Sequence, residues 1–133
     1  MISLDMLLQK MEQGEIILGI QMSQEDVEVM LEKRDDTIYS ARWMDLFRQI
    51  GEKKAGWGPS QDADSRVARL RESAFMQSYK RWRSPDLAAY ISDDFGLIGD
   101  ALVIEFTDRR VDLLLDRYLT GRFPSDLLPE CEK

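Results

Sequence analysis

The sequence predicts a single, mainly helical domain of five to seven helices that covers residues 1–133. Three observations support this fold class. The length of 133 residues suits one domain. A composition of 44% hydrophobic and 32% charged residues is typical of a globular protein. Apolar residues also recur at the i, i+3, i+4, i+7 spacing of one helix face in most segments.

The N-terminal segment should form the first helix, from Leu4 to Gln13, because its apolar residues share one helix face, and Gly14 should end it. The apolar run that follows is ambiguous. It fits a buried connector, but it also fits a short strand over 16–21 that pairs with 101–106. This small two-stranded element is the main alternative to an all-helical fold.

Ser23 is placed as an N-cap for a helix that begins at Gln24. A second apolar stripe starts at Tyr39 and includes Trp43 and Phe47, which we expect in the core. The two stripes do not lie on one line, so the sequence predicts a break near 35–37. Gly51 should end the second helix, since glycine favours the end of a helix.

A loop is expected over residues 51–62, because three glycines and a proline interrupt the helical pattern. A long helix should follow over 63–82. Ser84 and Pro85 give a strong helix start, with a short helix over 87–91 and a new start at 92–94. Thr107 and Asp108 should begin the last helix. Residues 122–133 form a short apolar tail that should fold back on the domain.

Several classes of chemistry are excluded by the absence of histidine. Histidine is the commonest general base and metal ligand, so catalytic triads and imidazole metal sites are ruled out. No glycine-rich phosphate-binding motif is present, and the sequence predicts no cofactor and no metal. The one cysteine, Cys131, lies in the tail and is expected to be a bystander.

The chain is expected to reside in a bacterial-type cytoplasm. Its first residues lack the basic region of a secretory signal, and its longest apolar stretch is far shorter than a transmembrane helix. A single tail cysteine also fits a reducing compartment, since it cannot form an internal disulfide. We therefore expect no association with a membrane.

Charge is unevenly distributed along the chain. Residues 51–83 contain eight basic and four acidic residues and carry +4, whereas the remainder carries −11. This asymmetry, together with the lack of catalytic motifs, predicts a non-catalytic protein-interaction module of the adaptor, immunity or chaperone type, with a basic protein partner. The candidate contact residues are an aromatic anchor, Trp57, and two acidic ridges at helical spacing, namely Glu25, Glu28 and Glu32, and Asp108, Asp112 and Asp116.

Two other functions stay open at this point. The ridge Asp108, Asp112 and Asp116 could hold a hard cation with help from another helix, as in a small carboxylate-dependent enzyme. The basic segment Lys80, Arg81 and Arg83 lies between aromatic residues and could contact nucleic acid. The overall net charge of −7 opposes that second function, because the field of the protein repels phosphate.

Overall fold

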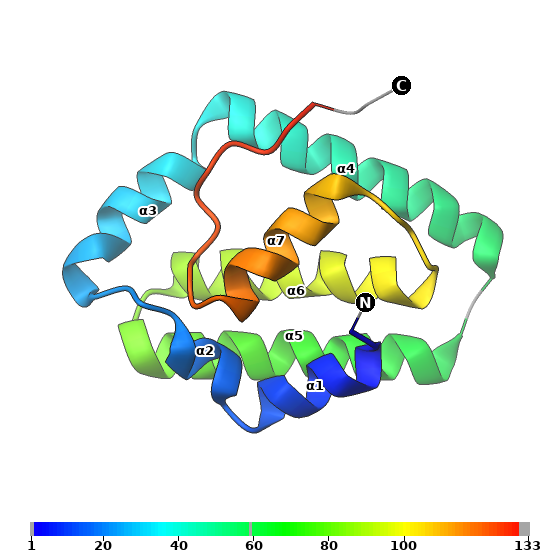
Figure 1. The fold of residues 1–133 in the computed structure, drawn as a ribbon, viewed down its shortest axis with the longest axis horizontal. Helices are drawn as coiled ribbons and strands as arrows, with labels where there is room; N and C mark the ends of the chain where they lie inside the picture. The colour runs from blue at the N-terminus through cyan, green and yellow to red at the C-terminus, as the bar shows by residue number, and fades with distance from the viewer. Residues whose placement is uncertain (1, 59, 131–133) are drawn as a thin grey trace.

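A computed structural model describes residues 2–58 and 60–130 (Figure 1). Every regular element in these residues is helical, so the predicted fold class is confirmed. The elements are α1 (Leu4–Glu12), α2 (Glu15–Gly19), the short 3₁₀ helix η1 (Gln24–Asp26), α3 (Val27–Arg34), α4 (Thr37–Trp57), α5 (Gln61–Trp82), α6 (Pro85–Val103) and α7 (Arg109–Leu119).

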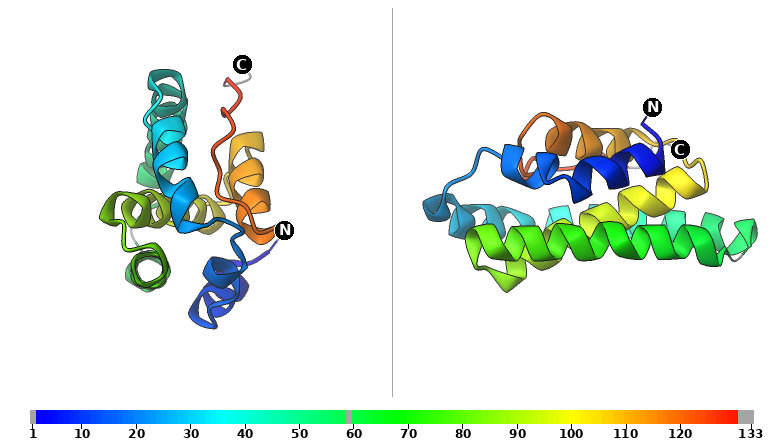
Figure 2. Two further views of the ribbon diagram at one scale, coloured as in Figure 1. Left: turned by 90° about the vertical axis from the view of Figure 1, so that its left-hand side faces the viewer. Right: turned by 90° about the horizontal axis from the view of Figure 1, so that it is seen from below.

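Helix α6 lies at the centre of the domain, and α1, α4, α5 and α7 surround it (Figure 2). The most extensive contact is between α5 and α6, which run antiparallel after a short connection. Leu87, Ile91, Phe95 and Ile98 on α6 are fully buried. A helix that is apolar on nearly all sides needs neighbours on all sides. This one shared core makes the chain a single compact domain.

The predicted helix starts are largely confirmed. The side chains of Ser84 and Asp108 accept hydrogen bonds from the first turns of α6 and α7, and Ser23 forms a capping box with Asp26. The predicted break near 35–37 is also present, since Asp36 caps the start of α4. Gly121 follows α7 with a φ of 81°, a conformation that favours glycine.

The two-stranded alternative is wrong for the described residues. Residues 15–19 form helix α2, with Ile16 and Ile17 buried and Leu18 74% exposed, which is not the alternation of a strand. The partner segment 101–106 begins inside α6. It then turns sharply at Glu105, whose φ of 55° is incompatible with a strand.

Two predicted interruptions are also wrong. Helix α4 continues through Gly51 to Trp57, so the predicted loop at 51–62 contains helix at both ends. Glycine costs a helix only about 1 kcal/mol relative to alanine, and tertiary contacts override that cost. Helix α6 likewise continues through residues 92–94. There the Ser92 hydroxyl donates to the Arg71 carbonyl at 3.1 Å instead of capping a new helix.

The described part of the tail, residues 122–130, folds back on the domain as expected. Phe123 and Leu128 are buried, and residues 122–130 carry no helical turn. Arg42 on α4 donates a 2.7 Å hydrogen bond to the Leu128 carbonyl. The described tail therefore ties α4 to the rest of the domain, while Cys131 lies outside the described residues.

Candidate functional site

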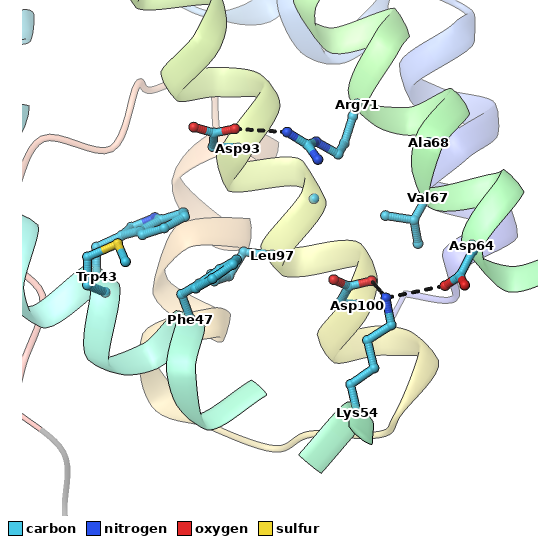
Figure 3. Close-up of a pocket in the computed structure, with 12 residues that line it drawn as sticks. Trp43, Phe47, Lys54, Asp64, Val67, Ala68, Arg71, Asp93, Leu97 and Asp100 are labelled. Carbon is cyan, nitrogen blue, oxygen red and sulfur yellow. Dashed lines mark hydrogen bonds and ion pairs between the residues drawn. The ribbon is translucent and has the colours of Figure 1, made fainter. Parts of the chain in front are cut away.

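A cleft of about 440 Å³ lies between α4 and α5, with α6 as its floor (Figure 3). The two wall helices both pack on α6 and make little contact with each other, which leaves the space between them open. The lining comes from α4 (Trp43, Met44, Phe47, Lys54), from α5 (Asp64, Val67, Ala68, Arg71) and from α6 (Asp93, Gly96, Leu97, Asp100).

The α4 wall of the cleft is apolar and open to solvent. Met44 is 52% exposed and Phe47 is 50% exposed, although both are large apolar side chains. The rings of Trp43 and Phe47 stack with their centroids 5.6 Å apart. Our prediction that Phe47 belongs to the core is therefore wrong, and Trp43 is only partly buried. We call Trp43, Met44 and Phe47 the apolar wall.

Ion pairs lie at both ends of the cleft. At one end, the Lys54 ammonium lies 3.2 Å from carboxylate oxygens of both Asp64 and Asp100. Burial alone would lower the pKa of Lys54, but the two carboxylates outweigh burial and raise it. At the other end, Arg71 lies 3.0 Å from Asp93. The cleft therefore presents three carboxylates and two cations around an apolar centre.

Gly96 determines the shape of the floor at the Arg71 end. A Cβ atom at this position would lie 2.7 Å from Cδ of Arg71, so the glycine lets the arginine stem cross directly over α6. The guanidinium of Arg71 then donates a hydrogen bond to Asp93, which precedes Gly96 by one turn of α6. The two wall helices therefore present different surfaces to the cleft. Helix α4 presents exposed aromatic side chains, whereas α5 presents Arg71, which is paired with Asp93.

A buried polar network holds Trp43, one residue of the apolar wall. Asp94, which is fully buried in α6, accepts two 2.8 Å hydrogen bonds from Arg34. It also accepts a 2.9 Å bond from Nε1 of Trp43 and a 2.6 Å bond from the hydroxyl of Tyr118. One carboxylate therefore joins α3, α4 and α7 to the central helix.

The charges of this network are balanced. Burial would lower the pKa of Arg34, but the facing Asp94 carboxylate raises it, so the guanidinium stays charged. Burial and the same carboxylate raise the pKa of Tyr118, which keeps its hydroxyl protonated as a donor. Arg34 also donates to the carbonyl of Pro124 at 3.3 Å. This second bond connects the tail to the network.

The sequence offered only partial signals for these residues. Arg34 falls on the apolar stripe of its segment, and Asp94 lies at helical spacing from the apolar residues Ile91 and Ile98. A charged residue on an apolar helix face is the pattern of a buried ion pair. The sequence instead predicts that the acidic pair at 93–94 caps a new helix, and this prediction is wrong. Asp93 is exposed and pairs with Arg71, whereas Asp94 is buried in the middle of a helix.

The first acidic ridge lies on η1 and α3. Glu25, Glu28 and Glu32 are all exposed, and none of them forms an ion pair within the part of the chain that the structure describes. None of these three residues lines the cleft, whose lining comes from α4, α5 and α6. The ridge therefore leaves three negative charges uncompensated on one short stretch of surface.

The second acidic ridge is partly used by the fold itself. Asp108 caps α7 and forms a 2.9 Å ion pair with the buried Arg110. Burial would raise the pKa of Asp108, but the hydrogen bonds from Arg110 outweigh burial and lower it. Asp112 and Asp116 are exposed, and Asp116 lies 3.7 Å from Arg117. Among the described residues, no three acidic or cysteine side chains form a group that could hold a metal ion.

The remaining candidate residues lie apart from the cleft lining. Trp57 ends α4 and is 51% exposed. In the basic segment, Lys80 and Arg83 are exposed at the end of α5. Arg81 packs over the ring of Trp82, with its guanidinium 4.3 Å from the ring centroid, and donates to the carbonyl of Ile17. Its guanidinium thus takes part in internal packing.

Within the described residues, no helix combines the length and apolar character needed to cross a bilayer. Comparisons with curated proteins and with solved structures give no match. A family model described as "Immunity protein PIM1" matches residues 6–125, a range that includes α2 to α7 and all of α1 except its first two residues. This match covers nearly the whole chain, and the protein therefore belongs to the PIM1 immunity protein family.

Proposed function

We propose that this protein neutralises a toxic protein by binding it directly, as a non-catalytic module, with the cleft between α4 and α5 as the main contact surface. Membership of an immunity protein family supports neutralisation. The apolar wall supports direct binding. No catalytic group needs to act in this proposal, because a bound toxin is inactive when its working surface is covered.

The observation that carries the proposal is the exposure of the apolar wall. Met44 and Phe47 remain half exposed, while the residues beneath them on α4, Leu46 and Ile50, are almost fully buried. An apolar patch rimmed by charged residues is typical of a protein contact site. Aromatic side chains at the centre of such a patch supply much of the binding energy. Trp43 and Phe47 have this position and this chemistry.

The acidic ridges would act at longer range. Glu25, Glu28 and Glu32 are exposed, as are Asp112 and Asp116, and the chain has a net charge of −7. Such a field attracts a basic partner and raises the rate of encounter, an effect that weakens as salt screens it. We place Trp57 at the margin of the contact and both ridges outside it, where they act through the field of the protein. The partner is therefore expected to be a basic protein of the cytoplasm.

Affinity purification of the full chain from its native cells, followed by mass spectrometry, tests this proposal. We expect one basic protein to co-elute with the wild type, and more of it at low salt than at physiological salt. Phe47→Asp should weaken capture at least 100-fold, about 2.7 kcal/mol, because it places a charge at the centre of the contact. The captured protein should also stop cell growth when expressed alone and permit growth when co-expressed with the wild-type chain.

Ile38→Asp provides the matched control. Ile38 is also on α4 and is 54% exposed, but it does not line the cleft. We expect this variant to capture and protect like the wild type. Equal losses in the two variants would contradict a role for the cleft. Recovery of no protein at either salt concentration would contradict the proposed function as a whole.

A further inference from the structure

The geometry of the cleft points to one kind of occupant. We propose that it receives a single amphipathic helix of the toxin, with a basic residue of that helix at the end formed by Lys54, Asp64 and Asp100. This inference rests on the proposed function, since the toxin supplies the helix. It adds the secondary structure, the orientation and the charge pattern of the bound segment.

The backbone of the walls excludes an extended segment. All lining residues belong to α4, α5 or α6, whose peptide groups are bonded within their own helices. The cleft therefore offers no free row of backbone donors and acceptors to a strand. A segment that buries its backbone against the apolar wall must satisfy its own N–H and C=O groups, and a helix does so internally.

The length of the cleft suits about two to three helical turns. On the floor, Asp93 and Asp100 mark the two ends and are seven residues apart on α6. At 1.5 Å per residue this separation is about 10.5 Å, or two turns. Apolar residues at i, i+3 or i+4, and i+7 of an incoming helix form one apolar face, which suits the apolar lining that Phe47, Leu97 and Val67 provide. The occupant would complete a four-helix arrangement with α4, α5 and α6.

The distribution of charge sets the orientation. At one end, two carboxylates, Asp64 and Asp100, share the single ammonium of Lys54, which leaves one negative charge uncompensated (Figure 3). At the other end, Arg71 and Asp93 balance each other. A lysine or arginine of the partner, or the positive N-terminal end of its helix, is therefore favoured at the Lys54 end.

The test uses the full chain and a phage-displayed library of amphipathic helical peptides of about 18 residues, in which the position of one lysine varies. Selected peptides, labelled with fluorescein, are titrated by fluorescence anisotropy, and their helicity is followed by circular dichroism. We expect peptides that gain helicity on binding. They should lose at least 10-fold in affinity for Phe47→Asp and keep their affinity for Ile38→Asp.

A charge exchange tests the orientation. Replacing the selected lysine by glutamate should weaken binding to the wild type at least 10-fold, and Asp64→Lys should restore binding of the glutamate peptide. Asp64 is largely exposed, so the variant should fold. Asp62→Lys is the matched control. It lies two residues away, pairs with Arg66, and does not line the cleft, so it should restore nothing.

Several results would overturn the inference without affecting the proposed function. These are peptides that bind without gaining helicity, peptides that bind Phe47→Asp normally, or a glutamate peptide rescued equally by both lysine variants. A wild type that sediments as a dimer and a Phe47→Asp variant that sediments as a monomer would assign the cleft to a second copy of this chain. The opposite result is also possible: helical peptides bind in the cleft, but no toxin is recovered from cells. That result would contradict neutralisation and would still support a cleft that binds a helix.

Discussion

Asp94 connects three other helices to the central helix α6 through hydrogen bonds. Its two carboxylate oxygens accept four hydrogen bonds, from Arg34, Trp43 and Tyr118, and the residue has no exposed surface. A buried ion pair contributes little net stability compared with apolar packing, but breaking one is costly, because the remaining charge stays buried without a partner. The sensitivity of this position to substitution should therefore be high.

We expect Asp94→Asn to lower the free energy of unfolding by about 3–5 kcal/mol, because it leaves the Arg34 guanidinium buried without its counter-ion. Urea denaturation followed by tryptophan fluorescence measures this change. Asp93→Asn is the control, since its ion pair with Arg71 is about half exposed and should be worth less than about 1 kcal/mol. The double variant Arg34→Met/Asp94→Asn should cost less than the two single changes together. Equal effects at positions 93 and 94 would contradict the importance of the network.

At the scale of elements, the sequence predicts where helices begin better than where they end. Ser84 and Asp108 cap helices as expected, because a capping bond is local and depends on residues three positions apart. Gly51 does not end α4, because tertiary contacts that the local sequence does not contain hold the last turns, among them the bond from Lys54 to Asp100. Sequence patterns therefore predict hydrogen bonds between residues close in the chain, and they miss contacts between residues far apart in it.

Glycines at two positions should respond in opposite directions to alanine. Gly51 lies in the interior of α4 with open space around it, so Gly51→Ala should raise the free energy of unfolding by about 0.5–1 kcal/mol. Gly121 has a φ of 81°, and a Cβ atom there would lie 2.7 Å from the Gly19 carbonyl oxygen, so Gly121→Ala should lower it by about 1–3 kcal/mol. Thermal or urea unfolding of both variants measures these shifts. A destabilised Gly51→Ala would show that this helix needs its flexibility.

At the scale of the whole molecule, the cleft could not be predicted from the sequence. Phe47 recurs with Trp43 and Ile50 at helical spacing, which is the same pattern that core residues follow. Whether such a stripe is covered depends on the angle between α4 and α5. The position of α4 depends on contacts between residues far apart in the chain, among them the hydrogen bond from Trp43 to Asp94. The first acidic ridge, in contrast, follows from sequence alone, since exposed charges at helical spacing need no tertiary information. In the second ridge Asp108 pairs with Arg110, a contact that the sequence does not predict.

The charge state of the folded domain should be insensitive to pH near neutrality, because the chain has no histidine. We expect an unfolding free energy that is nearly constant from about pH 5 to pH 9. Hydrogen bonding to Asp35 and burial raise the pKa of Tyr90 to about 12, and burial raises those of Tyr39 and Tyr118. A tyrosine whose pKa is higher in the folded than in the unfolded state contributes its full stabilisation below the unfolded pKa of about 10. This contribution is lost as the pH rises through the pKa of the folded state.

Urea denaturation at intervals of one pH unit measures this dependence. Stability should begin to fall above about pH 10 and continue to fall through pH 12. Tyr90→Phe provides the control, because it removes one titrating group and should make the alkaline decline less steep. At the acidic end, hydrogen bonds from Arg48 and Arg110 lower the pKa of Asp45, so stability should fall only below about pH 4. A transition between pH 6 and pH 8 would contradict this account.

The arrangement around Asp94 also constrains how the family can diverge. Arg34 and Asp94 are sixty positions apart in the chain, yet neither can change alone without leaving a charge stranded in the interior. Substitutions at these two positions should therefore occur together among descendants of one ancestral sequence, often with a change at Tyr118. The apolar wall of the cleft carries no such restriction, because Met44 and Phe47 are half exposed. Under the proposed function, a lineage would therefore change the toxin that it binds by substitutions at Met44 or Phe47 while its interior stays the same.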